Sequence, residues 1–349
     1  MRSIAFERIG SFENLLLAWR KAARGKRGNP ATAAFEHGLA DHLLGLQAEL
    51  LAGHYAPGRY VHFHVHEPKR RKISAAPFRD RVVHHALCNV IEPRFERRFI
   101  ADSYANRVGK GTHRAVARFK ELAGRYRYVL RADVVQHFAS IDHAILRATL
   151  ATEISEPDVM GLVDVVLAGG DGVHAEEYRQ VWFPGDDLLA ACRPRGLPIG
   201  NLTSQFWSNC YLHPLDMFVR NDLRCTAYLR YADDFALFGD RRDDLWHWKR
   251  RLIEQLARMR LTLHERATQV SRTADGAPWL GFVVGPDRVR LKSRRVVHAT
   301  QRLKARVRDY REKRIDRDRL RASITGWVNH ARYADSWRLR TKVLGGLRD

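Results

Sequence analysis

The sequence predicts an α+β fold, and two observations lead to that prediction. Over most of the 349 residues, apolar side chains recur every three or four positions, which is the period of amphipathic helices. Two apolar runs, Thr226 to Tyr231 and Phe235 to Phe238, flank a tight turn and predict an antiparallel hairpin, and Tyr128 to Val134 predicts a further strand. Helices that cover an antiparallel sheet define the α+β class.

The first 60 residues predict two helices. Phe12, Leu15 and Trp19 share a helical face directly after Ser11, a residue type that suits a helix N-cap. Apolar residues repeat with the same period from Leu39 to Leu50, and a basic, Gly-rich loop separates the two helices.

The residues from Tyr60 to Glu67 alternate between polar and apolar, which predicts a strand. Three histidines, His62, His64 and His66, fall on one face of this strand. Such a set could bind a metal ion, but the polar face of a half-buried strand has the same spacing, and we favour that second interpretation.

The middle of the chain predicts four helices around an irregular segment. They cover Phe78 to Phe95, Asp142 to Leu150 with Asp142 as the N-cap, Val159 to Leu167, and Leu202 to Val219. Pro214 is expected to kink the last of them. The Gly-rich residues 169–195 predict irregular structure.

The last third of the chain predicts mostly helices. A basic helix from Leu245 to Met259 is followed by short strands around Leu261, around Val270 and from Trp279 to Val284, and two basic helices follow Lys292.

Composition excludes several classes of protein. A hydrophobic share of 45% with 29% charged residues is typical of a globular chain and excludes a disordered one. The sequence has no run of 18 apolar residues and no apolar leader, so we expect no membrane association and a cytoplasmic location. The cysteines lack the C-x-x-C spacing of zinc sites and do not suggest a disulfide framework; they are Cys88, Cys192, Cys210 and Cys225.

The charge of the chain predicts a polyanionic partner. There are 61 Lys and Arg against 39 Asp and Glu, a net charge of +22. Residues 288–349 hold 20 of these cations against 6 acidic residues. Such an uneven positive charge is typical of nucleic-acid binding, although part of it is ordinary paired surface charge on helices.

Three carboxylates are placed where strands end. Asp233 and Asp234 occupy the turn of the predicted hairpin, and Asp133 closes the apolar run that starts at Tyr128. Two other Asp-Asp pairs, at 186–187 and 243–244, lie in polar contexts that suit loops and helix caps. Buried carboxylates are costly without a cation, so the first three predict a site for two Mg²⁺ ions that would serve phosphoryl transfer, with Mn²⁺ as an alternative. Taken alone, Asp133 could also be a strand-end cap.

Several motifs then resemble the reverse transcriptases of the bacterial non-LTR type. "YADD", "LRADVVQHFASIDH" and "RGLPIGNLTSQ" are similar to the family's palm motifs, "RKISAAPFRDRVVHHAL" and "DSYANRVGKGTHRAV" to its finger motifs, and "WLGFVV" to the strand that grips the primer. The resemblance runs in order from about Arg59 to Lys292. It implies a right-hand polymerase fold: an N-terminal helical extension (1–58), fingers with part of the palm (59–132), an antiparallel-sheet palm with finger insertions (133–292) and a short basic helical thumb (293–349).

The same resemblance implies roles for individual residues. Asp133, Asp233 and Asp234 match the catalytic, metal-binding carboxylates, and Phe138 matches the aromatic residue that excludes a 2′-hydroxyl, so the substrates would be deoxynucleotides. Arg71 and Arg79, with Lys69 as a weaker candidate, match residues that bind the triphosphate, a role that suits a guanidinium group; either arginine could instead be a surface charge. The remaining substrate-binding candidates are Ile199, Gly200, Gln205 and Tyr231. The nucleic-acid-binding candidates are Gly281, Lys292, Arg302, Lys304, Arg306 and Arg308.

Two departures from the family's usual motif narrow the expected subclass. Most reverse transcriptases have Gln where Ile199 stands and Ser-Pro where this chain has Ser204 and Gln205. Both features resemble the enzymes of diversity-generating retroelements, which implies copying of a dedicated structured RNA with errors at template adenines, and an accessory protein oligomer as partner. An anti-phage defence reverse transcriptase and a non-catalytic, maturase-like RNA-binding protein remain as alternatives.

Overall fold

Two units, each built from segments that are distant in sequence, make up the protein. The computed structural model describes residues 2–66 and 70–347. Unit 1 comprises Met1–Ala101, Val134–Leu223 and Arg251–His264, and unit 2 comprises Asp102–Asp133, Arg224–Arg250 and Glu265–Asp349. These units differ from the predicted division into extension, fingers, palm and thumb, which remains a prediction.

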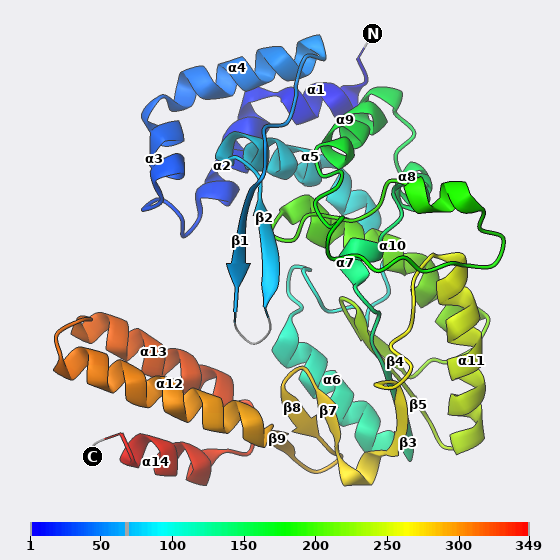
Figure 1. The fold of residues 1–349 in the computed structure, drawn as a ribbon, viewed down its shortest axis with the longest axis vertical. Coiled ribbons are helices and arrows are strands. Elements are labelled where there is room, and N and C mark those ends of the chain that lie inside the picture. The colour runs from blue at the N-terminus through cyan, green and yellow to red at the C-terminus, as the bar shows by residue number, and fades with distance from the viewer. Residues whose placement is uncertain (1, 67–69, 348–349) are drawn as a thin grey trace. The chain divides into compact units, whose positions relative to one another are not determined.

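The N-terminal half of unit 1 is helical (Figure 1). Its helices are α1 (Ile4–Gly10), α2 (Phe12–Ala23), α3 (Pro30–His37), α4 (Leu39–Ala52) and α5 (Phe78–Glu96). Three of them were predicted, and the Ser11 hydroxyl caps α2 as expected by accepting a hydrogen bond from the Asn14 amide at 3.3 Å. The helix α5 is central, because α1, α2, α3 and α10 all pack against it and its predicted stripe, including Val82, Val83 and Leu87, is fully buried.

A two-stranded antiparallel hairpin follows the first four helices. It consists of β1 (Val61–Val65) and β2 (Arg71–Ala75), with Val61 opposite Ala75. The first strand confirms the strand predicted from Tyr60 onward, although Glu67 lies outside the described residues. The expected half-buried character is wrong, because every residue of β1 is exposed and no layer of the described chain covers either face.

The second half of unit 1 contains one short, one long and two medium helices. They are α7 (His137–Ser140), α8 (His143–Ala151), α9 (Pro157–Ala168) and α10 (Leu202–Asn221), with a 3₁₀ turn at Leu188–Cys192. Asp142 caps α8 as predicted, since its carboxylate accepts a hydrogen bond from the Ile145 amide at 3.0 Å. The helix α10 continues through Pro214.

Unit 2 is organised around a four-stranded antiparallel sheet in the order β4-β5-β3-β6. The strands are β3 (Tyr128–Ala132), β4 (Tyr228–Tyr231), β5 (Asp234–Gly239) and β6 (Gln269–Arg272). The hairpin and the separate strand predicted from the sequence are therefore confirmed. The strand expected around Leu261 is wrong: only Leu263 pairs there, in a single bridge to Val134 within unit 1, because the segment is a short link after helix α11 (Arg242–Arg258).

A second, three-stranded sheet shares a core with helix α6 (Thr112–Arg125). Its strands are β7 (Ala277–Trp279), β8 (Phe282–Val284) and β9 (Val289–Leu291). The ring of Phe119 on α6 lies 4.9 Å from Phe238 of the first sheet and 5.1 Å from Trp279 of the second. The buried aromatic rings thus join both sheets of unit 2 into one core.

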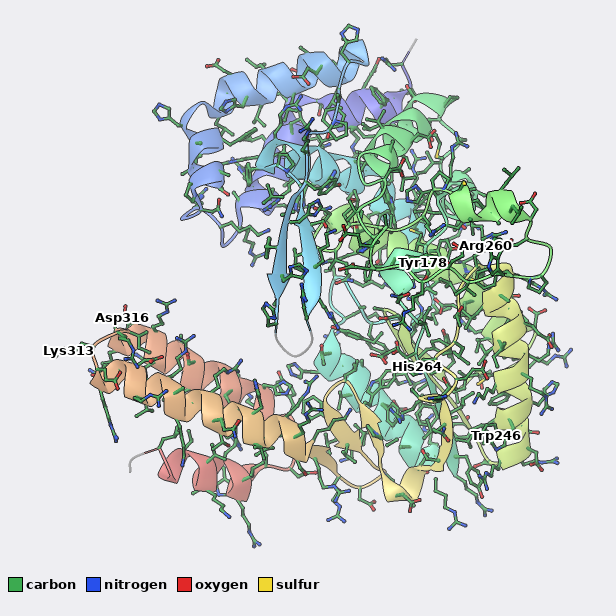
Figure 2. The ribbon with its side chains drawn as sticks, in the orientation of Figure 1. Tyr178, Trp246, Arg260, His264, Lys313 and Asp316 are labelled. Atoms are coloured by element: carbon green, nitrogen blue, oxygen red, sulfur yellow. The ribbon has the colours of Figure 1, made fainter. Side chains whose placement is uncertain are left out.

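The described part of unit 2 ends in three helices, where the sequence predicted two. They are α12 (Ser293–Arg311), α13 (Arg317–Ala331) and α14 (Trp337–Gly345). Leu303, Trp327, Ala331 and Val343 form their small core, and Lys313 and Asp316 mark the turn between α12 and α13 (Figure 2). Within the described part of the chain, no helix combines the length and the apolar character that a membrane crossing needs.

Candidate active site

The register of the sheet in unit 2 brings the ends of three chain segments to one edge. In β3 and β5, Ala132 lies opposite Phe235, so the next residue of the chain, Asp133, reaches the level of Asp234. In β4 and β5, Tyr231 lies opposite Asp234, which leaves Ala232 and Asp233 as a two-residue turn. The three carboxylates predicted from the sequence are therefore gathered at one end of a single sheet.

The turn that carries Asp233 has a strained backbone. Ala232 has a φ of 53°, in the left-handed region that residues other than glycine rarely adopt. The fully buried Arg230 donates a hydrogen bond from Nη1 to the Ala232 carbonyl oxygen at 3.2 Å. The next residue of β4, Tyr231, accepts a hydrogen bond at its hydroxyl from Thr112 at 3.0 Å. Two consecutive side chains of β4 thus stabilise the strand end that leads into this turn.

The electrostatics at this edge favour a cation. Burial, followed by the neighbouring charges of Asp133 and Asp233, raises the pKa of Asp234 to about 7. The cationic groups of Arg131 and Lys292 oppose this shift only in part. A carboxyl group whose ionisation is resisted by two other carboxylates is stabilised in its charged form when a positive ion joins it.

The donor set suits Mg²⁺, which prefers carboxylate oxygens and binds through few protein ligands. Among residues 2–66 and 70–347, however, no group of three or more His, Cys, Asp and Glu side chains is arranged as a ready metal site. The carboxylates are therefore suitable ligands for Mg²⁺ and lie at the same edge of the sheet. Their side chains would have to move to coordinate the ion together.

Cations of unit 2 surround the carboxylates. Arg131 donates a hydrogen bond from Nη1 to the Pro278 carbonyl oxygen at 2.6 Å. The pKa of Lys292 is lowered by burial and by the charges of Arg131 and Arg295, and Asp234 opposes that shift. Gly281 has a φ of 96°, and a side chain there would collide with the Arg295 guanidinium. The predicted residues Gly281 and Lys292 thus belong to the same part of unit 2 as the carboxylates.

Unit 1 holds most of the predicted substrate-binding residues. Phe138 lies on the short helix α7, and its carbonyl oxygen accepts a hydrogen bond from the Leu197 amide at 2.8 Å. Two residues further on, the Ile199 carbonyl oxygen accepts a hydrogen bond from the Ser74 amide of β2 at 2.9 Å. Gly200 follows with a φ of 123°, and a Cβ there would lie 3.0 Å from Ile73. These contacts bring Phe138, Ile199 and Gly200 into one network with the β1–β2 hairpin.

The other predicted substrate-binding residues of unit 1 have different surroundings. Arg71 is exposed on β2, opposite Val65. Arg79 forms an ion pair with Glu49 and donates a hydrogen bond to the Ala56 carbonyl oxygen at 3.3 Å, so it would have to exchange these partners to bind a triphosphate. Gln205 is half-buried in the first turn of α10, and Lys69 lies outside the described residues.

Four of the predicted nucleic-acid-binding residues lie on α12. Arg302, Lys304 and Arg308 are exposed, and Arg306 is half-buried at 3.9 Å from Asp309. The two other Asp-Asp pairs have the ordinary roles expected of them. Asp187 caps the 3₁₀ turn, and the pair at 243–244 occupies the first turn of α11.

Sequence reasoning missed the residues that support these segments. Arg131 and Arg230 were not singled out, although each lies two or three residues before a predicted carboxylate. His143 and His174 were also missed, and both contact the segment that leads to Ile199. The His174-x-x-Glu177 spacing was a usable signal, since the first and fourth residues of a turn lie close together and residues 171–177 form turns.

Comparison with known proteins agrees with this geometry. The sequence model of the family described as "Reverse transcriptase (RNA-dependent DNA polymerase)" matches residues 66–284. The chain is 26% identical over 310 residues to protein YkfC of Escherichia coli, which covers 77% of each chain. It is 21% identical over 277 residues to the group II intron-encoded protein LtrA of Lactococcus lactis, of which it spans 44%, and 29% identical over 94 residues to nuclear intron maturase 1 of Arabidopsis thaliana, of which it spans 13%.

Among solved structures, an apo telomerase from Candida tropicalis matches with a TM-score of 0.49 and 10% identity, over 73% of this chain and 53% of that chain. The helices, the antiparallel sheets and the matched residues together confirm the predicted α+β class and its right-hand polymerase type. The chain belongs to the reverse transcriptase family.

Proposed function

We propose that this protein is an active RNA-directed DNA polymerase that copies a structured RNA into complementary DNA. One observation carries the proposal: Asp133, Asp233 and Asp234 lie at one edge of one sheet, and their mutual repulsion contributes to a raised pKa at Asp234. A protein that kept this fold only to dock on RNA would not need a costly group of carboxylates.

The three carboxylates would hold the metal ions. Two Mg²⁺ ions, or Mn²⁺ in their place, would supply activation of the primer hydroxyl and charge stabilisation for the leaving pyrophosphate. Arg230 and Tyr231 keep the Asp233 turn in place for that role, and Lys292 adds a positive charge beside Asp234.

The substrate-binding residues of unit 1 would choose the nucleotide. Phe138 would exclude the 2′-hydroxyl of a ribonucleotide, while the exposed Arg71 would bind the triphosphate through its guanidinium. Gly200 and Gln205 would contact the same nucleotide. Arg79 is the weaker candidate for the triphosphate, because Glu49 already neutralises it.

The basic helices of unit 2 would hold the RNA and its duplex with complementary DNA. The exposed Arg302, Lys304 and Arg308 provide positive charge along α12 that would neutralise backbone phosphates. Gly281 lets Arg295 lie against the β7–β8 hairpin, which adds another cation beside Lys292.

We further propose that copying is error-prone at template adenines, as in diversity-generating retroelements. Support comes from Ile199, an aliphatic residue that cannot donate the hydrogen bonds of the Gln common at this position, and loss of such a contact weakens discrimination between nucleotides. An anti-phage defence enzyme is the alternative within the same activity. The sequence of complementary DNA made from co-purified RNA separates them, since scattered errors at adenines support diversification, and accurate copies or repeats support defence.

The relatives named as intron maturases favour a second candidate, a non-catalytic RNA-binding protein. Primer extension on an RNA template with Mg²⁺ and deoxynucleotides decides between the two. We expect Asp233→Asn to abolish extension and to leave RNA affinity unchanged, while Asp243→Asn, an exposed member of another Asp-Asp pair, extends like the wild type. Equal extension by both variants, or none by the wild type, would reject the polymerase.

A further inference from the structure

Two buried histidines of unit 1 contact the backbone of neighbouring residues in the segment that leads to Ile199. His143 Nε2 lies 2.7 Å from the Gly196 carbonyl oxygen, and His174 Nε2 lies 2.9 Å from the Leu197 carbonyl oxygen. The two side chains come from different segments, α8 and the Gly-rich stretch, and meet the same dipeptide.

The second ring nitrogen of each histidine also faces an oxygen. His174 Nδ1 lies 2.8 Å from a carboxylate oxygen of Glu177, and His143 Nδ1 lies 3.3 Å from a carboxylate oxygen of Asp171. Carbonyl oxygens only accept hydrogen bonds, so each Nε2 atom donates to the backbone. Of the two Nδ1 contacts, that between His174 and Glu177 has hydrogen-bond geometry, whereas His143 and Asp171 lie at an ion-pair distance.

The dipeptide held in this way belongs to the network around Phe138. The Gly196 amide donates a hydrogen bond to the Ile141 carbonyl oxygen at 2.8 Å, and the Leu197 amide donates one to the Phe138 carbonyl oxygen at 2.8 Å. Gly196 has a φ of 94°, and a Cβ there would lie 3.2 Å from the His174 ring. The backbone and the imidazole are therefore packed closely, and the segment is enclosed between α7 and the two histidines.

Charged and aromatic residues line a cavity beside His174. A cavity of about 280 Å³ lies against His174 and is lined also by Asp171, Tyr178, Arg193 and Arg195; Tyr178 is labelled in Figure 2. The Arg195 guanidinium is 4.0 Å from the centre of the Tyr178 ring and donates a hydrogen bond to the Ala191 carbonyl oxygen at 3.0 Å.

The carboxylates are the more accessible members of each pair. The Glu177 side chain is 38% exposed, whereas the His174 side chain is 3% exposed, so the carboxylate can be changed without cutting into the core.

We propose that His143 and His174 are positioning residues whose Nε2 hydrogen bonds hold the Gly196–Leu197 backbone and thereby fix Phe138 and Ile199 for nucleotide binding. The effect on nucleotide binding rests on the proposed polymerase function, whereas the effect on the backbone does not. When one of these hydrogen bonds is lost, the segment loosens and the affinity for deoxynucleotides falls. The rate of the chemical step depends on other residues.

The first test does not require polymerase activity. Amide hydrogen exchange of residues 196–200 is measured for the wild type and for His143→Gln and His174→Gln, with helix α2 of the same unit as the internal reference. We expect faster exchange at 196–200 in both variants and unchanged exchange in α2. Exchange at 196–200 that equals that of the wild type would overturn the inference even if the enzyme is active.

The second test uses KM for a deoxynucleotide, with Glu177→Gln as the main variant because it should fold, His174→Gln as the stronger one and His54→Gln, an exposed histidine of the same unit, as the control. We expect His174→Gln to raise KM about tenfold, the size expected for the loss of one hydrogen bond, and Glu177→Gln to raise KM by less, with kcat unchanged in both. A KM equal to that of the wild type in both variants would overturn the link to nucleotide binding, whereas inactivity of the wild type would reject the polymerase and leave the first test decisive.

Discussion

The two units hold their candidate functional residues by different means. In unit 2, the sheet register that pairs Ala132 with Phe235 also sets the level of Asp133 and Asp234, so a continuous ladder of backbone hydrogen bonds fixes the carboxylates. In unit 1, Phe138 and Ile199 lie on short or irregular segments that are joined by single hydrogen bonds, one from Leu197 and one from Ser74.

This difference suggests that unit 2 holds the carboxylates rigidly, whereas unit 1 selects the nucleotide through segments that can shift. A ladder of many bonds tolerates the loss of one of them, whereas a segment held by a few bonds shifts when one is lost. We therefore expect changes in unit 2 to act through charge, and changes in unit 1 to act through the position and stability of nucleotide-binding segments.

Acid should weaken unit 1 through its central helix. Burial lowers the pKa of His84 from 6.5 to about 3, and the charges of His85 and Arg81 act in the same direction. Between these values the unfolded chain binds a proton that folded His84 does not, so stability falls as the pH falls, by at most about 1.4 kcal/mol for each pH unit. Hydrogen exchange of α5 measures this loss, which His84→Leu should reduce; an unchanged slope in that variant would rule out His84 as the cause.

Phe138→Ala should change the choice of sugar. Removing the ring opens the space that a 2′-hydroxyl needs, so we expect kcat/KM for ribonucleotides to rise about 10- to 200-fold relative to deoxynucleotides, as for a pocket that loses a steric contact. Single-nucleotide incorporation measures the ratio. Continued exclusion of ribonucleotides would show that another residue contacts the sugar.

Ile199→Gln should make copying more accurate. A restored amide can hydrogen-bond beside the new base pair, and a bond of this kind corresponds to about 2- to 10-fold in discrimination. Sequencing of products from an adenine-rich RNA template measures the errors, with Ile199→Leu as the control that keeps an aliphatic residue. The same error rate in both variants would separate Ile199 from fidelity.

Ala232→Gly should be the mildest change, because the sheet fixes the turn of unit 2 on both sides. Glycine adopts a φ of 53° without the cost that alanine has, so we expect the free energy of unfolding to rise by about 1 kcal/mol or less. Chemical denaturation measures it. Ala236→Gly, in the buried strand β5, should lower stability instead, and equal losses in both variants would mean that Ala232 is not strained.

The sequence predicted the carboxylate edge better than the segment around Ile199, for a physical reason. Asp133, Asp233 and Asp234 follow apolar runs that form adjacent strands, so local patterns contain the whole signal. The contacts of Ile199 and Leu197 come from Ser74, Phe138 and His174, which are far away in sequence and leave no periodic pattern. Helices α6 and α14 and strand β2 were also missed. The first lies within a motif that was interpreted by resemblance, and the other two are short.

The most direct test of the central claim is where a divalent metal binds. Fe²⁺ that replaces Mg²⁺ transfers one electron to added hydrogen peroxide, whose O–O bond breaks to give hydroxide and a hydroxyl radical. This radical cuts the backbone close to the ion. We expect cuts near residue 133 and near residues 233–234 in the same molecules, suppressed by excess Mg²⁺ and absent from the Asp234→Asn variant. Cuts elsewhere, or the same cuts in that variant, would contradict the assignment of these carboxylates as the metal site.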